Sequence, residues 1–210
     1  MIQDTLLNAI KANYPMMIIF TVVICVVRIA YLIVNKKPFV FYKELFLFAF
    51  IIYSLSLFYV VTFEDNNYGT NNFIPFREIT RYEFLSSYFI HNVIGNILLF
   101  IPFGYFVSTI FKSKKPFAII IVSILTSLTI EITQFLIGRT FDIDDIILNL
   151  AGCIIGYLMF LVVYLLEHKF AIFQKNYVKN ILVIVFIVLL GILYFKTSLW
   201  GILRWLQLLI

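Results

Sequence analysis

Acidic, amide and basic side chains gather in one short stretch of this sequence, residues 131–152, EITQFLIGRTFDIDDIILNLAG. The rest of the chain is mostly apolar, since 63% of its 210 residues are hydrophobic and only 13% are charged. Carboxylates can transfer protons or accept hydrogen bonds from amines and hydroxyls, and arginines can hold phosphate or carboxylate through forked hydrogen bonds. The groups concerned are Glu131, Gln134, Arg139, Asp142, Asp144, Asp145 and Asn149.

Composition predicts the environment of these groups. A mean hydropathy of +1.03 is too high for a water-soluble domain of this length, which would leave much of that surface exposed. Several runs reach the roughly 20 apolar residues that cross a bilayer core. We therefore predict an all-α polytopic membrane bundle of about six transmembrane helices, in which spans two to five form the core. The predicted spans are Tyr14–Val34, Phe41–Phe63, Ser87–Phe111, Pro116–Ile137, Asp145–Leu166 and Lys179–Phe195.

The distribution of cations predicts the orientation of the bundle. Lysines concentrate in the loops after spans one, three and five, whereas the loops after spans two and four hold only Arg77, Arg81 and Arg139. The positive-inside rule then places the lysine-rich loops in the cytoplasm and both termini outside. The net charge of +5 describes a basic rim that faces anionic lipid, and not a nucleic-acid surface.

The chain reads as a single integral membrane domain over residues 1–210, because no linker or low-complexity tract divides it. Both cysteines, Cys25 and Cys153, fall inside predicted spans, where they are expected to be small packing residues. Nothing in the sequence indicates a cofactor.

Helical periodicity places the polar residues on two faces that can meet. One face of the predicted fourth span has the positions i, i+4, i+8 and i+11: Ser123, Ser127, Glu131 and Gln134. One face of the fifth has the positions i, i+3, i+7, i+10 and i+14: Asp142, Asp145, Asn149, Gly152 and Gly156. Because helices joined by a short loop are antiparallel neighbours, we expect the two faces to be opposed.

The third span and the loop before it add further polar groups. Asn92 and Asn96 lie in YFIHNVIGNILLFIPFG, and an unpartnered amide in hydrocarbon costs several kcal/mol, so Asn96 needs a partner within the bundle. Arg77 and Arg139 are expected at the rim. We predict an outward-facing polar recess formed by Arg77, Asn92, Asn96, Glu131, Gln134, Arg139, Asp142, Asp145 and Asn149.

Several of these residues also have a purely structural explanation. Asp142 is a natural N-cap for the fifth helix, and the Gly-xxx-Gly pattern of Gly152 is typical of close helix packing. A metal site of His91, Glu131 and Asp145 fits in charge but lacks ligand spacing within any one segment, so we predict no metal ion. Glu131 is the exception, because a carboxylate about two turns below the surface must be paired, neutralised or hydrated. Arg139 is its expected partner.

Three ordered motifs resemble the VanZ-like family of bacterial membrane proteins. They are NFIPF followed by Arg77, the run NVIGNILLFIPFG, and E-xx-Q-xxxx-R-xx-D-x-DD-xxx-N-xx-G-xxx-G from Glu131 to Gly156, which together cover residues 72–157. The resemblance implies a bacterial cell membrane protein. The founding member of that family is linked to resistance against teicoplanin, a glycopeptide with a fatty-acyl tail, without removal of the drug's peptidoglycan target. Family membership supplies no molecular mechanism.

Three functions are compatible with these observations. We favour a binding protein whose recess holds the headgroup of an envelope lipid or of a lipidated antibiotic, and so lowers susceptibility to teicoplanin-type lipoglycopeptides. The first alternative is a membrane enzyme that acts on a phosphate-bearing lipid headgroup, with Glu131 as general base; the second is a lipid or drug transporter. No Gly-x-Ser-x-Gly, His-Glu-xx-His or Cys–His constellation is present, which disfavours catalysis.

Overall fold

The computed structural model describes residues 2–63, 70–112 and 114–189, and within these ranges the protein is helical and has no strand. Four stretches are long and apolar enough to cross a membrane, and they correspond to predicted spans two to five. They lie in α2 (Phe41–Phe63), in Ser87–Phe111, in α6 (Pro116–Leu136) and in α7 (Ile143–Lys169). The expected helical membrane bundle is therefore confirmed.

The third of these stretches is a composite helix. It contains α4 (Ser87–Phe89), the π-helical segment η1 (Ile90–Ile94) and α5 (Gly95–Phe111). The predicted first span lies within the longer α1 (Ile2–Val34). The predicted sixth span corresponds to the helix Asn176–Leu189, and its continuation to Phe195 lies outside the described residues.

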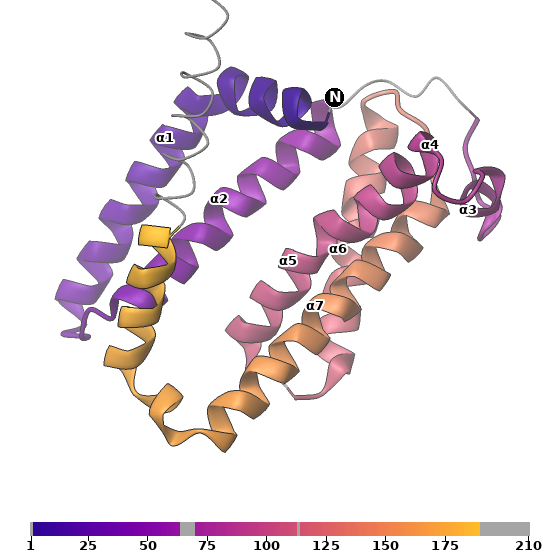
Figure 1. Ribbon diagram of the computed structural model, residues 1–210. Helices are drawn as coiled ribbons and strands as arrows, with labels where there is room; N and C mark the ends of the chain where they lie inside the picture. Colours follow the sequence, from indigo (N-terminus) through magenta and orange to yellow (C-terminus); the bar gives the residue numbers. More distant parts are fainter. Residues whose placement is uncertain (1, 64–69, 113, 190–210) are drawn as a thin grey trace, which may run out of the picture.

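Three helices, α5, α6 and α7, form the centre of the molecule (Figure 1). Along the chain α6 runs opposite to both α5 and α7, so α5 and α7 are parallel to each other. The buried apolar core joins these three helices to α2, and its members are Leu57, Phe100, Phe103, Val107, Ile119, Cys153, Tyr157 and Phe160. On the side of α2, the Tyr53 hydroxyl donates to the Leu99 carbonyl at 2.6 Å.

Glycines allow the backbones of α5 and α7 to touch. A Cβ atom added at Gly152 would clash with the carbonyl oxygen of Ile97, and one added at Gly156 would clash with that of Ile101. Both distances are shorter than those that Cβ atoms show in proteins. Gly104 on α5 lies against the Cys153 carbonyl in the same way. The glycine pattern is thus used for close helix packing, as the structural explanation predicted.

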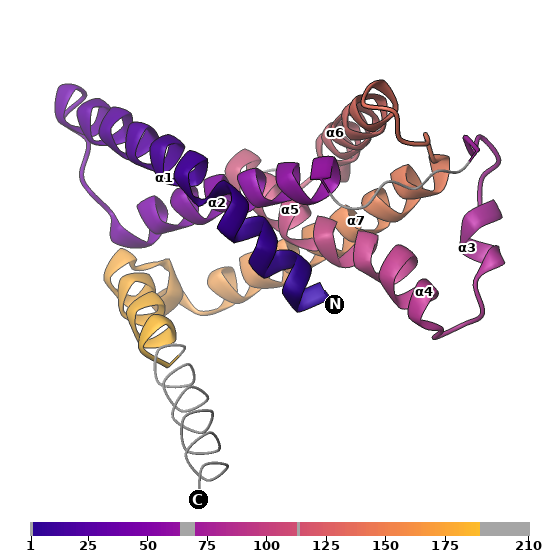
Figure 2. The ribbon, with the colours of Figure 1, turned by 90° about the horizontal axis from the view of Figure 1, so that it is seen from above.

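The two ends of the bundle differ in chemistry. One end, which we call the lysine-rich end, contains the α5–α6 loop, the last residue of α7 and the loop after α7, with Lys112, Lys114, Lys115, Lys169 and Lys175. At the other, which we call the acidic end, lie the α6–α7 turn and α3 (Arg77–Arg81). Viewed from above, α3 and α4 project from one side of the bundle, away from the helix Asn176–Leu189 (Figure 2).

A substitution that adds one methyl group between α5 and α7 tests their close contact. We expect Gly156→Ala to lower the melting temperature of the detergent-solubilised protein, because the new Cβ forces two backbones apart at a cost of about 1–3 kcal/mol. Gly95→Ala is the matched control, since its Cβ would make only an ordinary contact of 3.7 Å with the Ile90 carbonyl. Equal melting temperatures for the two variants would contradict this packing.

Candidate functional site

The turn between α6 and α7 is built by local capping. Gly138 has a φ of +87°, a left-handed conformation that favours glycine, and the Arg139 N–H donates to the Gln134 carbonyl at 2.9 Å. Asp142 then starts α7, since its side chain accepts the Asp144 N–H at 2.8 Å. The predicted N-cap is therefore confirmed. Burial raises the pKa of the Asp142 carboxyl above its usual range, although the Asp144 N–H and the Asn72 amide both favour the charged form.

Glu131 connects the end of α6 to this turn. Its side chain is 1% exposed, and its Oε2 accepts the backbone N–H of Asp142 at 2.8 Å. Arg139 interacts electrostatically with the carboxylates of both Glu131 and Asp145. The expected Glu131–Arg139 attraction is present, but the hydrogen bond seen for the Glu131 carboxylate comes from the backbone of the next helix.

Two amides join the three central helices. Asn96 on α5 donates from Nδ2 to Oδ1 of Asp145 on α7 at 2.6 Å. Asn149 on α7 donates from Nδ2 to Oγ of Ser127 on α6 at 2.9 Å. The polar faces of α6 and α7 are therefore opposed, as their periodicity predicted, and Asn96 has the partner that its depth requires.

The predicted site residues differ in their exposure. Three are buried at 1–8% exposure, namely Glu131, Asn149 and Gln134. Five are partly exposed, namely Asn92, Asn96, Arg139, Asp142 and Asp145, and Arg77 is exposed on α3. Hydrogen bonds of Asn96, Asp145, Asn149 and Glu131 reach neighbouring elements of the central bundle, whereas Arg77 lies on α3. The structure thus brings together the predicted residues on α5, α6 and α7 and places Arg77 on a separate element.

Asn72 and Asp144 attach this separate element to the bundle, a role that the sequence did not predict. Asn72, which is 4% exposed, makes a short parallel bridge with the turn: its N–H donates to the Phe141 carbonyl at 2.8 Å and its own carbonyl accepts the Ile143 N–H at 3.0 Å. Its Nδ2 also donates to Asp142 Oδ1 at 2.8 Å. The loop before α3 is therefore hydrogen-bonded along the α6–α7 turn.

Asp144 holds the start of α3. Its carboxylate is 1% exposed and accepts three backbone N–H groups, from Phe76 at 2.5 Å, from Glu78 at 2.7 Å and from Ile79 at 3.3 Å. Phe76 has a φ of +66°, an unfavourable conformation for a bulky residue, which the Asp144 bond helps to maintain. An acidic residue at a helix start was visible in the sequence, but its partners lie more than 60 residues earlier in the chain.

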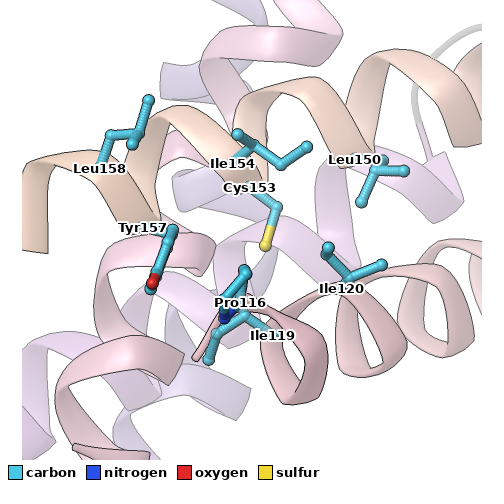
Figure 3. A pocket seen from close by; sticks show the side chains of 8 residues that line it. All are labelled: Pro116, Ile119, Ile120, Leu150, Cys153, Ile154, Tyr157 and Leu158. Carbon is cyan, nitrogen blue, oxygen red and sulfur yellow. The ribbon is translucent and has the colours of Figure 1, made fainter. Parts of the chain in front are cut away.

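A cavity of about 130 Å³ opens between α6 and α7 (Figure 3). Its lining includes Pro116, the first residue of α6, on the side of the lysine-rich end. None of the predicted site residues lines it. Over the described parts of the chain, no three His, Cys, Asp or Glu side chains form a group that could hold a metal ion.

A family model described as VanZ/LLP1 matches residues 39–165, which is more than half of the chain. The protein belongs to the VanZ/LLP1 family. The match extends from the start of α2 almost to the end of α7, so the VanZ/LLP1 region includes Asn72, Asp144 and every predicted site residue. Searches among curated proteins and among solved structures returned no match.

The attachment of α3 to Asp144 can be measured by hydrogen exchange. We expect Asp144→Asn to accelerate exchange in peptides that cover residues 73–81, because hydrogen bonds to a charged acceptor contribute about 1.5–3 kcal/mol each. Glu83→Gln removes an exposed carboxylate from the same region and should leave exchange unchanged. Equal exchange in both variants and the wild type would show that Asp144 does not hold α3.

Proposed function

We propose that this protein binds the polar headgroup of an envelope lipid or lipidated antibiotic at its acidic end, and thereby lowers susceptibility to teicoplanin-type lipoglycopeptides. The observation that carries the proposal is Glu131, a carboxylate that is 1% exposed on a helix capable of crossing a membrane, held by the Asp142 N–H near Arg139. Ionisable groups at such positions are costly and usually have a function.

In this proposal the two arginines of the predicted site, Arg77 and Arg139, bind the acidic group of the ligand. Arg77 is exposed on α3 and Arg139 is partly exposed at the turn, so both can reach a phosphate or carboxylate at the membrane surface. Forked guanidinium bonds favour planar or tetrahedral anions over neutral groups. Arg139 would exchange part of its attraction to Glu131 and Asp145 for the ligand's anion.

The partly exposed acids and amides would hold the remaining polar groups. Asp142, Asp145, Asn92 and Asn96 can accept an amine or sugar hydroxyls, and two of them are already oriented by the Asn96–Asp145 bond of 2.6 Å. The buried members, Glu131, Gln134 and Asn149, would form the inner wall of the site. Glu131 also holds the Asp142 N–H, so its replacement would displace the turn that carries Asp142 and Arg139.

An acyl chain on the ligand would lie in the bilayer beside this end. Apolar side chains that are 58–78% exposed lie in the segments before and after α3: Phe73, Ile74, Phe76, Phe84 and Leu85. Aromatic and aliphatic groups around an arginine are typical of segments that lie at a membrane interface. A lipidated drug held there by its headgroup would be kept from anchoring beside its target.

The proposal places the acidic end on the outer face of a bacterial cell membrane, because the lysines are at the opposite end. With Cys25 and Cys153 replaced, a cysteine introduced at Glu83 should react with a membrane-impermeant maleimide in intact cells. A cysteine introduced at Lys175 should react only after permeabilisation. The reverse pattern would place the acidic end in the cytoplasm and overturn the proposed site.

Resistance provides the functional test. Expressed in a susceptible bacterium, Glu131→Gln and Arg139→Ala should return the minimal inhibitory concentration of teicoplanin to that of cells without the protein. Arg81→Ala and Glu83→Gln remove exposed charges of the same types and should retain protection. The minimal inhibitory concentration of a glycopeptide without an acyl chain should be the same in cells with the protein, with any variant and without it. Full protection by both site variants, at equal membrane levels, would exclude this site from the mechanism.

A further inference from the structure

The cavity between α6 and α7 has no part in the proposed function. Its walls are Pro116, Ile119, Ile120, Leu150, Cys153, Ile154, Tyr157 and Leu158, and Figure 3 shows these side chains gathered from both helices around it. Two of them face outward from the bundle, since Ile154 is 39% and Leu158 52% exposed. The cavity is therefore accessible from the side at which a membrane helix meets lipid.

Hydrocarbon is a better occupant of this cavity than water. A buried water needs two to four polar partners, and apolar cavities of about 150 Å³ stay dry and bind small hydrocarbons. The one hydroxyl in the lining, on Tyr157, already donates to the Lys114 carbonyl at 2.5 Å. In a bilayer, the available hydrocarbon is an acyl chain.

A lysine, Lys114, lies beside this cavity. Lys114 lies two residues before Pro116, which lines the cavity. Its carbonyl is held by Tyr157, and its Nζ lies 4.5 Å from the centre of the Tyr164 ring. The positive end of the α6 dipole is at the same place, because α6 begins at Pro116.

The surrounding charge is also positive. Lys112 and Lys115 are exposed in the same loop. The carboxylate near this end of α7, Glu167, is paired with Lys179 at 2.8 Å and so does not oppose an anion. An anionic group next to Lys114 would therefore meet cations and a helix N-terminus, with an apolar cavity directly beneath.

We propose that an anionic phospholipid of the leaflet at the lysine-rich end binds here, with a segment of one acyl chain in the cavity and its phosphate beside Lys114. This site is separate from the headgroup site at the acidic end, and it does not depend on that proposal. The bound lipid would fill the gap between α6 and α7.

Native mass spectrometry of the purified protein tests this site. The protein is equilibrated with equal amounts of dioleoyl phosphatidylglycerol and dioleoyl phosphatidylcholine, which share acyl chains and differ in headgroup charge. We expect one phosphatidylglycerol molecule to be retained over phosphatidylcholine by about fivefold, since one lysine near an anionic lipid contributes about 1 kcal/mol. Lys114→Gln should remove this preference. Lys43→Gln, which also removes a lysine lying over a tyrosine ring, should not.

Cavity filling tests the position of the acyl chain. Ile154→Trp should reduce retained phosphatidylglycerol about tenfold, because displacing even two methylenes costs that much. Ile155→Trp is the control, since Ile155 is 40% exposed, is adjacent in sequence and does not line the cavity. If Ile154→Trp fails to fold, Ile120→Phe against Ile121→Phe makes the same comparison from α6.

Two results would overturn the inference. Equal retention of the two lipids by the wild type would show that the cations select no headgroup. Equal loss, or no loss, in the cavity variant and its control would show that the acyl chain does not occupy the cavity.

Discussion

The hydrogen bond from the Asp142 N–H to the Glu131 carboxylate, 2.8 Å long, is the contact on which the acidic end depends. It connects a buried side chain of α6 to the residue that begins α7, and so it determines where the turn lies relative to both helices. A buried carboxylate without such a donor is strongly destabilising in a protein interior. The position of the turn follows from the requirement to satisfy that charge.

The remaining polar contacts extend from this turn. Asp142 caps α7 and accepts the Asn72 amide, and Asp144, two residues later, holds the backbone amides at the start of α3. A segment that precedes α5 in the chain is thereby fixed beside the junction of α6 and α7. In our proposal the arginines and amides at this end bind the ligand, whereas the most buried acids hold the structure that presents them.

The two halves of the central bundle use different interactions. Toward the acidic end, α5, α6 and α7 are joined by side-chain hydrogen bonds such as Asn96–Asp145. Toward the lysine-rich end, the backbones of α5 and α7 approach each other at glycines, and an apolar cavity lies between α6 and α7. A polar end held by hydrogen bonds and an apolar half with a cavity fit our two proposals, a headgroup site at one end and an acyl-chain site toward the other.

Hydropathy, capping rules and helical periodicity predicted much of this arrangement. Of about six predicted spans, spans two to five correspond to helices long and apolar enough to cross a membrane, whereas Ile18–Val34 and Asn176–Leu189 are shorter apolar helices. The Asp142 cap, the close packing at Gly152 and the opposed faces of α6 and α7 were also predicted. The attachment of α3 could not be predicted, because Asp144 binds backbone N–H groups, which every residue except proline possesses, so the sequence does not single out the partners. For the same reason the sequence did not single out the Asp142 N–H as a hydrogen-bond donor to Glu131.

Binding of fluorescently labelled teicoplanin to the purified protein in lipid nanodiscs tests the central claim most directly. The account predicts saturable binding to the wild type that is lost in both Glu131→Gln and Arg139→Ala while each variant keeps its helical circular dichroism. Undiminished binding to either folded variant, or no saturable binding to the wild type, would contradict a headgroup site at the acidic end.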